Sequence, residues 1–387
     1  MRYAVGIIGL AIVAVVLWEV FETIILPRRV TRRVRLTRTL YVLTWWPWSG
    51  LARRLRNNRR REKLLSFYGP LSLMFLLAVW AIGLLIGFAV IHWAAGTHLG
   101  SSELTGFWAD LYFSGSTFFT LGLGDLTPAT NFERAITVVQ SGVGIGFFAM
   151  IISYLPVLYQ AFSRREVNIS MLDARAGTPP TAGELLRRHH EAGDMENLTQ
   201  LLKDWEKWSA DLLESHLSYP VLCYFRSQHD NQSWLSALST ILDTCALVMV
   251  GVDGIPKWQA QLTFKMTRHA VVDLTQVFNT SPLTSDGQRL TGQDLAQLRS
   301  GLAEVGVLLS NDDGDEQTLA ELREMYEPYL VVLSEYLVMP IPGWLPKKRL
   351  VDNWQTSAWE VTKPAREEPF RKCMLEEKRA AKKLAAH

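Results

Sequence analysis

The sequence predicts an all-α membrane protein, in which a two-helix membrane module follows one further transmembrane helix and precedes an all-helical soluble domain. Apolar segments at residues 3–26, 64–93 and 131–162 are each long enough to cross a hydrocarbon core of ~30 Å at ~1.5 Å per residue. The charge is divided: 15 Lys and Arg against 7 Asp and Glu in residues 1–162, and 25 against 31 in residues 163–387. Apolar residues in the second part recur at helical spacing, without the alternation typical of strands.

The first apolar segment, residues 1–26, is predicted to be an uncleaved transmembrane helix. Its apolar run is too long for a signal peptide, and no small-x-small cleavage site follows it. Residues 27–63 contain 13 Arg and Lys and the single acid Glu62, which places this segment on the cytoplasmic side. We therefore expect a plasma-membrane protein with its N-terminus outside and its C-terminal domain in the cytoplasm.

The basic segment 27–63 allows two interpretations. Arginines at every third residue from 29 to 38 have the spacing of a voltage-sensing helix, but such a helix needs apolar residues between its arginines along a full span. The apolar part here covers only residues 40–48, so an interfacial helix pair, broken at Pro47 and Gly50, fits better. Six arginines are expected to bind anionic lipid headgroups: Arg28, Arg29, Arg32, Arg33, Arg35 and Arg38.

Between the second and third apolar segments, residues 120–125 read Thr-Leu-Gly-Leu-Gly-Asp. Glycines at alternate positions permit backbone dihedrals that a side chain would forbid. Four such strands around an axis could point successive carbonyl oxygens inward and replace the water shell of a cation. The run therefore predicts an ion selectivity filter. The residues expected to coordinate the cation are Thr120, Leu121, Gly122, Leu123 and Gly124.

This run resembles the pore signature of potassium channels, Thr-Val/Ile-Gly-Tyr-Gly-Asp, and the likeness extends over residues 64–162. Arg134 stands nine residues after the filter aspartate and Gly144 ten residues later, as in several members of that family. The resemblance implies an outer helix over 64–93, a pore helix over 106–119, a filter over 120–125 and an inner helix over 131–162. It also implies residues that brace the filter, which here are Asp125, Tyr112, Phe113 and Ser116.

One filter loop per chain implies a homotetramer with cyclic symmetry, because a complete pore needs four loops. The sequence departs from the family at Leu123, which replaces the filter tyrosine and cannot donate a hydrogen bond. A potassium-selective channel is the leading hypothesis, with potassium ions and no organic cofactor. The alternatives are a weakly selective cation channel and a membrane-anchored scaffold with a vestigial pore. No catalytic arrangement is recognisable, so the chain is not expected to be an enzyme.

The inner helix contains three glycines, which permit bending or close packing. A gating hinge and a purely packing role both fit Gly142, Gly144 and Gly146. A nucleotide-binding function is excluded for this Gly-x-Gly-x-Gly run because no strand precedes it. The candidates for a hydrophobic gate are Phe147, Phe148 and Ile151.

Residues 163–180 are interpreted as a linker and residues 181–387 as a helical cytoplasmic domain. Thr181 and Glu184 form a capping-box pattern that opens the first helix. Further helices are expected at 198–212, 235–252, 258–278, 290–309 and 319–338, with a charged helix or tail from 366. The acidic excess argues against a nucleic-acid partner. The pattern does not identify a ligand or protein partner for this domain.

Overall fold

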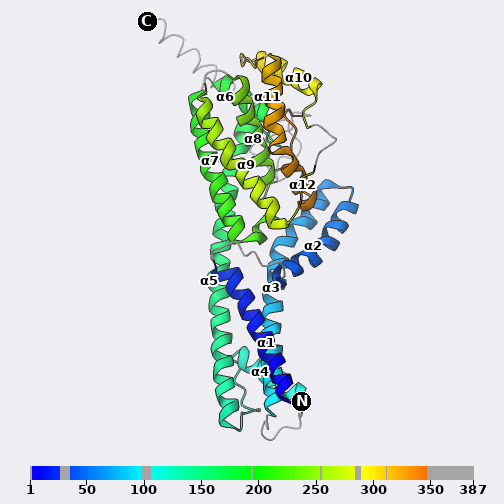
Figure 1. Cartoon of the computed structure of the whole chain (residues 1–387), viewed down its shortest axis with the longest axis vertical. Coiled ribbons are helices and arrows are strands. Elements are labelled where there is room, and N and C mark those ends of the chain that lie inside the picture. The colour runs from blue at the N-terminus through cyan, green and yellow to red at the C-terminus, as the bar shows by residue number, and fades with distance from the viewer. Residues whose placement is uncertain are drawn as a thin grey trace, which may run out of the picture. The chain divides into compact units, whose positions relative to one another are not determined.

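The computed structural model describes residues 2–26, 35–96, 106–192, 195–229, 231–252, 255–283, 289–310 and 312–346. Within these ranges the chain is all-α, as predicted, and contains no strand (Figure 1). It divides into two compact units, Met1–Phe162 and Ser163–His387. Each unit is described by itself below.

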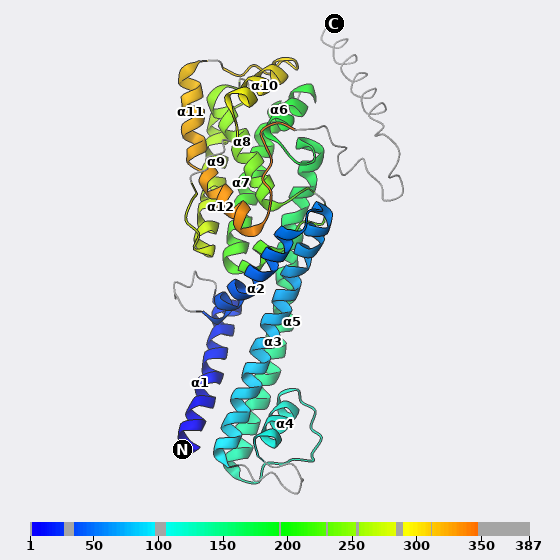
Figure 2. The ribbon, with the colours of Figure 1, turned by 90° about the vertical axis from the view of Figure 1, so that its right-hand side faces the viewer.

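The first unit contains the membrane module. Its helices are α1 (Arg2–Val20, continued by a π-helical turn, Phe21–Ile25), α2 (Leu36–Arg54), α3 (Asn58–Ala95), α4 (Phe107–Phe118) and the first part of α5 (Asn131–Ala176). Helices α1, α3 and α5 are long and apolar enough to cross a membrane. Helix α4 and the N-terminus of α1 lie at the same end of this unit (Figures 1 and 2).

Helix α1 packs against α3 through glycines on both helices. A Cβ added at Gly9 would meet the Gly87 carbonyl oxygen at 2.8 Å, and one at Gly83 would meet Val16 at 2.9 Å. Small residues at such contacts let two helices approach closely in lipid, where dispersion forces rather than the hydrophobic effect hold helices together. The first span is therefore attached to the outer helix of its own chain.

Two acids at the end of α1 hold the beginning of α2. The buried Glu19 carboxylate accepts hydrogen bonds from the backbone N–H groups of Leu36 (3.0 Å) and Thr37 (3.2 Å) and from the Thr37 hydroxyl (2.9 Å). Glu22 accepts a hydrogen bond from the Trp18 indole at 2.7 Å and lies 3.8 Å from the Arg35 guanidinium. An anion at a helix N-terminus is favoured by the helix dipole and by its unpaired N–H groups. Glu19 thus caps α2 from another helix.

Replacing Glu19 with alanine is expected to lower the free energy of unfolding by about 1–3 kcal/mol, because the α2 donors would be left buried without an acceptor. Thermal or denaturant unfolding in detergent, followed by circular dichroism, measures the change. Glu62→Ala is the control, because the ion pair of Glu62 with Arg61 is 3.9 Å long and partly exposed. Equal stability of the two variants would contradict the capping role.

Helices α2 and α3 form a hairpin, and two predictions about it are wrong. Helix α2 is not broken at Pro47 but continues through it, because the helix packs on α3 through contacts such as that of Trp45 with Tyr68. Helix α3 begins at Asn58 rather than at residue 64, because the Asn57 side chain caps it, accepting from the Arg59 and Arg60 N–H groups at 3.0 and 3.3 Å.

Of the six arginines expected to bind lipid, two lie among the described residues, and their surroundings differ. Arg28, Arg29, Arg32 and Arg33 lie outside the described residues. Arg35 interacts with Glu22 and donates a hydrogen bond to the Thr23 hydroxyl at 3.2 Å, whereas Arg38 is exposed.

The second unit is a helical domain. It contains the end of α5, then α6 (Ala182–Ala192), α7 (Met195–Ser218), a 3-10 turn (Pro220–Tyr224), α8 (Trp234–Gly251), α9 (Lys257–Phe278), α10 (Gly292–Ala303), α11 (Asp313–Glu324) and α12 (Glu327–Leu337). The Thr181 hydroxyl accepts a hydrogen bond from the Glu184 N–H at 3.4 Å, as the capping pattern predicts. The predicted charged segment from residue 366 lies outside the described residues.

Three predicted boundaries in the second unit need correction. The segment 163–176 is not a linker but the end of α5, because one of its faces is buried, with Ile169 and Leu172 in the core. The helix expected at 290–309 begins later, after a capping box of Thr291 with Asp294. The helix expected at 319–338 is two helices, since α12 begins anew after the fully buried Tyr326.

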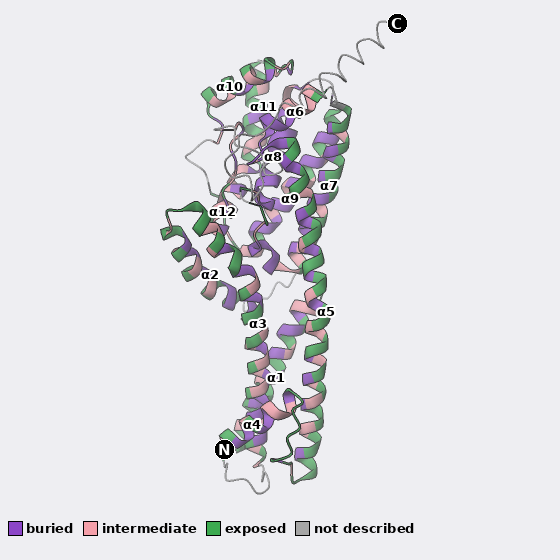
Figure 3. Cartoon of the chain, turned by 180° about the vertical axis from the view of Figure 1, so that it is seen from behind, coloured by how far each residue is buried: buried purple, intermediate pink, exposed green. Residues whose placement is uncertain are grey.

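Helix α8 is also long and apolar enough to cross a membrane, but it forms the core of the second unit (Figure 3). Its residues are buried from Trp234 to Val248. Buried Asp243 on this helix accepts hydrogen bonds from Arg289 at 2.7 Å and from the Tyr326 hydroxyl at 2.6 Å. A buried carboxylate with these partners indicates a protein interior, so we assign α8 to the domain core.

A second buried polar cluster anchors the segment of α5 that belongs to this unit. The Arg165 guanidinium donates hydrogen bonds to the carbonyl oxygens of Leu222 and Phe225, each at 2.9 Å, and lies 3.2 Å from His216 Nε2. Burial, and then the Arg165 charge, hold the pKa of the His216 imidazole well below its usual value. His216 is therefore neutral, and its Nε2 accepts the hydrogen bond from Arg165.

Candidate functional site

Helix α4 is held between α3 and α5 by a chain of buried hydrogen bonds. The Ser114 hydroxyl donates to the Leu85 carbonyl oxygen at 2.7 Å. The Gln140 side-chain amide donates to the Ser114 carbonyl and hydroxyl oxygens at 2.9 and 2.7 Å. The Gln140 amide oxygen lies 3.0 Å from His92 Nε2, and the His92 ring packs edge-on against Phe113. Sequence reasoning missed Ser114, Gln140 and His92, although a glutamine inside an apolar helix was a usable signal.

Gln140→Ala is expected to lower the free energy of unfolding of the detergent-solubilised protein by about 1–3 kcal/mol, because Ser114 and His92 would lose a partner in a buried site. Near-ultraviolet circular dichroism during thermal unfolding checks this. Gln160→Ala is a matched control, since Gln160 lies exposed on the same helix. Indistinguishable unfolding of the two variants would show that the network does not hold α4.

The loop after α4 has the backbone geometry expected of the predicted filter. The N–H groups of Phe119, Thr120 and Leu121 donate back to carbonyl oxygens of the last turn of α4, at 2.9, 3.2 and 2.8 Å. The φ angles of Thr120, Gly122 and Gly124 are 56°, 62° and 77°, all in the left-handed region, whereas the intervening leucines have negative φ. In an extended segment whose φ changes sign at every residue, successive peptide groups have the same orientation. Their carbonyl oxygens can therefore line one side of the segment.

The left-handed conformation of Thr120 is notable because threonine is β-branched and not a glycine. Such a residue costs about 1–2 kcal/mol in this region, so the surrounding structure must hold it. The hydrogen bond from the Thr120 N–H to the Thr117 carbonyl oxygen supplies part of that restraint.

The loop returns to α4 through the residues predicted to brace it. Asp125 accepts a side-chain hydrogen bond from the Tyr112 hydroxyl. The next residue, Leu126, packs in a buried cluster with Ala109 and Phe113. Ser116 contributes its carbonyl oxygen, which accepts from the Leu121 N–H, rather than its side chain. The four residues therefore lie around one loop, and their effect on a filter stays a prediction.

Helix α5 begins directly after this loop with a capping box that the sequence analysis overlooked. The buried Glu133 carboxylate accepts from the N–H groups of Ala129 and Thr130 at 2.9 and 3.1 Å, and the Thr130 hydroxyl accepts from the Glu133 N–H at 3.3 Å. The pattern Thr-x-x-Glu at 130–133 was the available signal. The predicted basic residue Arg134 donates to the Pro128 carbonyl oxygen at 3.3 Å and so ties the loop to the helix.

The three glycines of α5 have different surroundings. A Cβ at Gly144 would meet the Phe118 carbonyl oxygen, at the end of α4, at 2.6 Å. A Cβ at Gly142 or Gly146 would meet no heavy atom within 4 Å. Gly144 is therefore required for close packing of α5 against α4, and only Gly142 and Gly146 are free of that requirement.

Of the three gate candidates, Phe147 is buried within its own chain. Its side chain is 1% exposed and its ring lies 5.9 Å from that of Phe118, so it belongs to the contact between α5 and α4. Phe148 is partly exposed, with its ring 6.0 Å from that of Phe119, and Ile151 is of intermediate exposure. These two remain candidates.

A continuous apolar stripe on α5 is exposed in the described part of the chain. Its members recur at steps of three and four residues, which places them on one face of the helix. The exposed positions are Val138, Gly142, Ile145, Ala149, Ile152, Pro156 and Tyr159. Leu121 and Leu123 of the loop are exposed as well.

Comparison with known proteins found a family match for the module formed by α3, α4 and α5. Residues 74–160, which run from within α3 through α4 and the loop into α5, match a family model described as "Ion channel". These residues are therefore similar to that ion-channel family. A curated relative, the "Uncharacterized membrane protein YdjJ" of Bacillus subtilis (strain 168), is 24% identical over 263 residues, which cover 66% of this chain and 74% of the relative. No solved structure matches the chain.

The ion-channel module offers oxygen ligands from the backbone rather than a cluster of acidic side chains. Among the described residues, no group of three or more His, Cys, Asp and Glu is placed to hold a metal ion. The alternating φ angles at Thr120–Gly124 instead allow the loop's carbonyl oxygens to line one side. Uncharged oxygen ligands of this kind can replace the hydration shell of a cation without binding it too tightly to leave.

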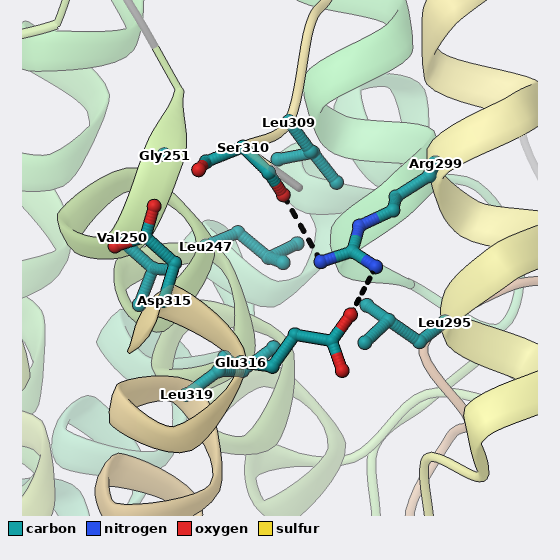
Figure 4. A pocket seen from close by; sticks show the side chains of 10 residues that line it. All are labelled: Leu247, Val250, Gly251, Leu295, Arg299, Leu309, Ser310, Asp315, Glu316 and Leu319. Atoms are coloured by element: carbon teal, nitrogen blue, oxygen red, sulfur yellow. Dashed lines mark hydrogen bonds and ion pairs between the residues drawn. The ribbon is translucent and has the colours of Figure 1, made fainter. Parts of the chain in front are cut away.

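The second unit has a small pocket that an ion pair between Arg299 and Glu316 crosses (Figure 4). It lies between α8, α10 and α11. Arg299 crosses it, donating to the Glu316 carboxylate and, at 3.0 Å, to the Ser310 carbonyl oxygen. This ion pair takes up part of the pocket, and we take the loop after α4 as the candidate functional site.

Proposed function

We propose that the protein is a potassium-selective channel that conducts the cation passively through a fourfold pore. The observation that carries the proposal is the alternation of left-handed φ at Thr120, Gly122 and Gly124 within an ion-channel module. Carbonyl oxygens of residues 120–124 and the Thr120 hydroxyl would replace the water around potassium. The C-terminal end of α4, with its partial negative charge, would favour cations below the filter.

A homotetramer is part of this proposal, because one loop lines only a quarter of a pore and cyclic symmetry supplies the rest. Two observations support it. The apolar stripe from Val138 to Tyr159 and the exposed side chains of Leu121 and Leu123 lie at positions that neighbouring subunits would cover. In such an assembly the non-helical loop would be enclosed by protein, as backbone at membrane depth must be.

The membrane orientation is also proposed. Nine Arg and Lys against one acid in residues 35–63 favour a cytoplasmic position for the hairpin of α2 and α3. The filter loop and the N-terminus lie at the opposite end of the first unit, which would then face outward in the plasma membrane (Figure 2).

Bilayer recording of the purified protein under opposed potassium and sodium gradients tests the selectivity. The expected reversal potential lies near the potassium equilibrium value, and barium is expected to block the current. Thr120→Ala should weaken both properties, whereas the control Thr127→Ala, an exposed residue of the same loop outside the filter, should leave them unchanged. Unchanged selectivity and block in Thr120→Ala would reject the proposal. The absence of flux, together with a stable partner protein, would favour a scaffold.

A weakly selective cation channel is the second candidate, and Leu123 is the observation that favours it. Its side chain is 63% exposed in the single chain and carries no group that could hydrogen-bond to a neighbouring subunit and stiffen the filter. A reversal potential near zero with open current would support this candidate. Leu123→Tyr should then move the reversal potential toward the potassium value, and no movement would remove the reason for proposing it.

A further inference from the structure

The hairpin of α2 and the first turns of α3 has an exposed apolar face. The opposite face of α2 packs on α3: the Trp45 and Tyr68 rings lie 4.7 Å apart, and the Trp48 indole donates to the Leu64 carbonyl oxygen at 3.2 Å. On the outward face Trp46 is 81% exposed and Leu43 is 68% exposed. A helix at the surface of a soluble domain normally presents polar residues there.

Basic side chains surround this apolar face. Arg54, Arg56, Arg59, Arg60 and Lys63 are all exposed at the tip of the hairpin. The only acid between residues 35 and 63 is Glu62, which already forms an ion pair with Arg61 at 3.9 Å. The tip therefore carries a concentrated positive charge.

Two of these arginines lie where the helix dipole of α3 disfavours a positive charge. Arg59 and Arg60 lie in the first turn of α3, which contains no acidic residue. The partial positive charge at a helix N-terminus favours anions and disfavours cations. Because these charges do not stabilise the helix that carries them, an external anionic surface is their natural partner.

The hairpin is also continuous with a membrane span. Helix α3 has 38 residues. At ~1.5 Å per residue its length is about 57 Å, well beyond a hydrocarbon core of ~30 Å. The Tyr68 hydroxyl, in the N-terminal part of α3, contacts the Thr44 hydroxyl at 2.9 Å, so α2 lies along the part that extends past the core. In Figures 1 and 3 the hairpin of α2 and the first turns of α3 is inclined to the axis of the rest of α3.

We propose that this hairpin docks on the cytoplasmic leaflet as an anionic-lipid binding surface. Trp46 and Leu43 insert at the boundary of headgroups and acyl chains, where aromatic and aliphatic side chains of interfacial helices reside. Arg54, Arg56, Arg59 and Arg60 bind the phosphates of anionic phospholipids. This site differs from the one expected over residues 28–38, and it does not depend on what the pore conducts.

Spin labels on the full-length chain test the insertion. In a Cys373→Ser background, nitroxides are placed by Trp46→Cys or, keeping Trp46, by Leu43→Cys; the fully buried Cys223 and Cys245 do not react. Trp258→Cys is the matched control, because Trp258 lies in the second unit and is 65% exposed. In liposomes containing phosphatidylglycerol, labels at 43 and 46 should be reached by oxygen and shielded from a water-soluble nickel complex. The label at 258 should be reached by nickel.

Three outcomes would overturn the proposal. Labels at 43 and 46 as accessible to nickel as the label at 258 would mean that the face is in water. Labels shielded from both oxygen and nickel would mean that protein, either a second copy or another partner, covers it. Equal insertion with phosphatidylcholine alone would remove the role of anionic headgroups.

Charge neutralisation tests the arginines separately. Changing Arg54, Arg56, Arg59 and Arg60 to Gln should weaken phosphatidylglycerol binding, counted by native mass spectrometry, at least about tenfold. The control changes the same number of exposed lysines of the second unit, Lys203, Lys207, Lys257 and Lys265, to Gln. Equal lipid binding by the two variants would contradict the assignment, and a selective loss in the arginine variant would support it.

Discussion

Replacing Gly124 with alanine is expected to abolish ion permeation while leaving the fold intact. The φ of Gly124 is 77°, where an L-residue with a Cβ is strained by roughly 1–2 kcal/mol. In a fourfold pore the strain is repeated in every subunit and amounts to about 4–8 kcal/mol for the ring. At ~1.4 kcal/mol per factor of ten, the alternating conformation becomes at least ~1000-fold rarer. Flux of a radioactive or fluorescent-reporter cation into proteoliposomes measures the loss.

Gly146→Ala is the matched control for this variant. An added Cβ meets no heavy atom within 4 Å at either position, so the two substitutions differ in backbone conformation and not in crowding. Gly146 lies within helix α5, where alanine is preferred to glycine. Full permeation through the Gly124→Ala protein would show that the left-handed conformation is not needed for conduction.

Gly144→Ala is expected to destabilise the module and to reduce permeation at least about tenfold. The new Cβ would lie 2.6 Å from the Phe118 carbonyl oxygen, a backbone atom that can move only if the last turn of α4 moves. Overpacking of this kind costs about 1–3 kcal/mol per subunit. Because that turn also accepts the hydrogen bonds of Phe119, Thr120 and Leu121, its displacement would reach the loop. Thermal unfolding in detergent and proteoliposome flux together measure both effects.

Gly142→Ala is the control on the same helix, since its Cβ would meet no heavy atom of its own chain within 4 Å. It should leave the protein equally stable or gain up to about 1 kcal/mol from the better helix propensity of alanine. If Gly144→Ala unfolds at the same temperature as Gly142→Ala, the close contact with Phe118 is not important for stability. Altered opening kinetics in Gly142→Ala, without a change in stability, would identify that position as a hinge.

Local sequence signals predicted the parts of the fold that depend on local chemistry. Apolar length located the spans α1, α3 and α5, and the alternating glycines located the loop in which φ changes sign. The capping pattern at Thr181 placed the start of α6. These features are determined within one element, so spacing and residue type suffice to find them.

Features that depend on contacts between elements could not be read in the same way. Gly142, Gly144 and Gly146 are equivalent in the sequence, and only the approach of α4 distinguishes the middle one. Residues 163–176 contain several charged residues and resemble a linker until Arg165 is seen bonded to the carbonyl oxygens of Leu222 and Phe225. Pro47 predicts a helix break, but packing of α2 on α3 preserves the helix. Such contacts join residues that lie far apart along the chain.

The cap that Glu19 provides has a consequence for biosynthesis. Helix α1 leaves the ribosome before the groups that hydrogen-bond to its buried carboxylate, which belong to Leu36 and Thr37, 17 and 18 residues later in the chain. Until residues 36 and 37 emerge, the carboxylate of Glu19 in the nascent span has no hydrogen-bond donor from α2. The translocation machinery would then meet a hydrophobic segment with a polar end. Stable membrane integration of the first span is thus coupled in time to the synthesis of α2, and a chain truncated before residue 36 should be released or degraded rather than retained.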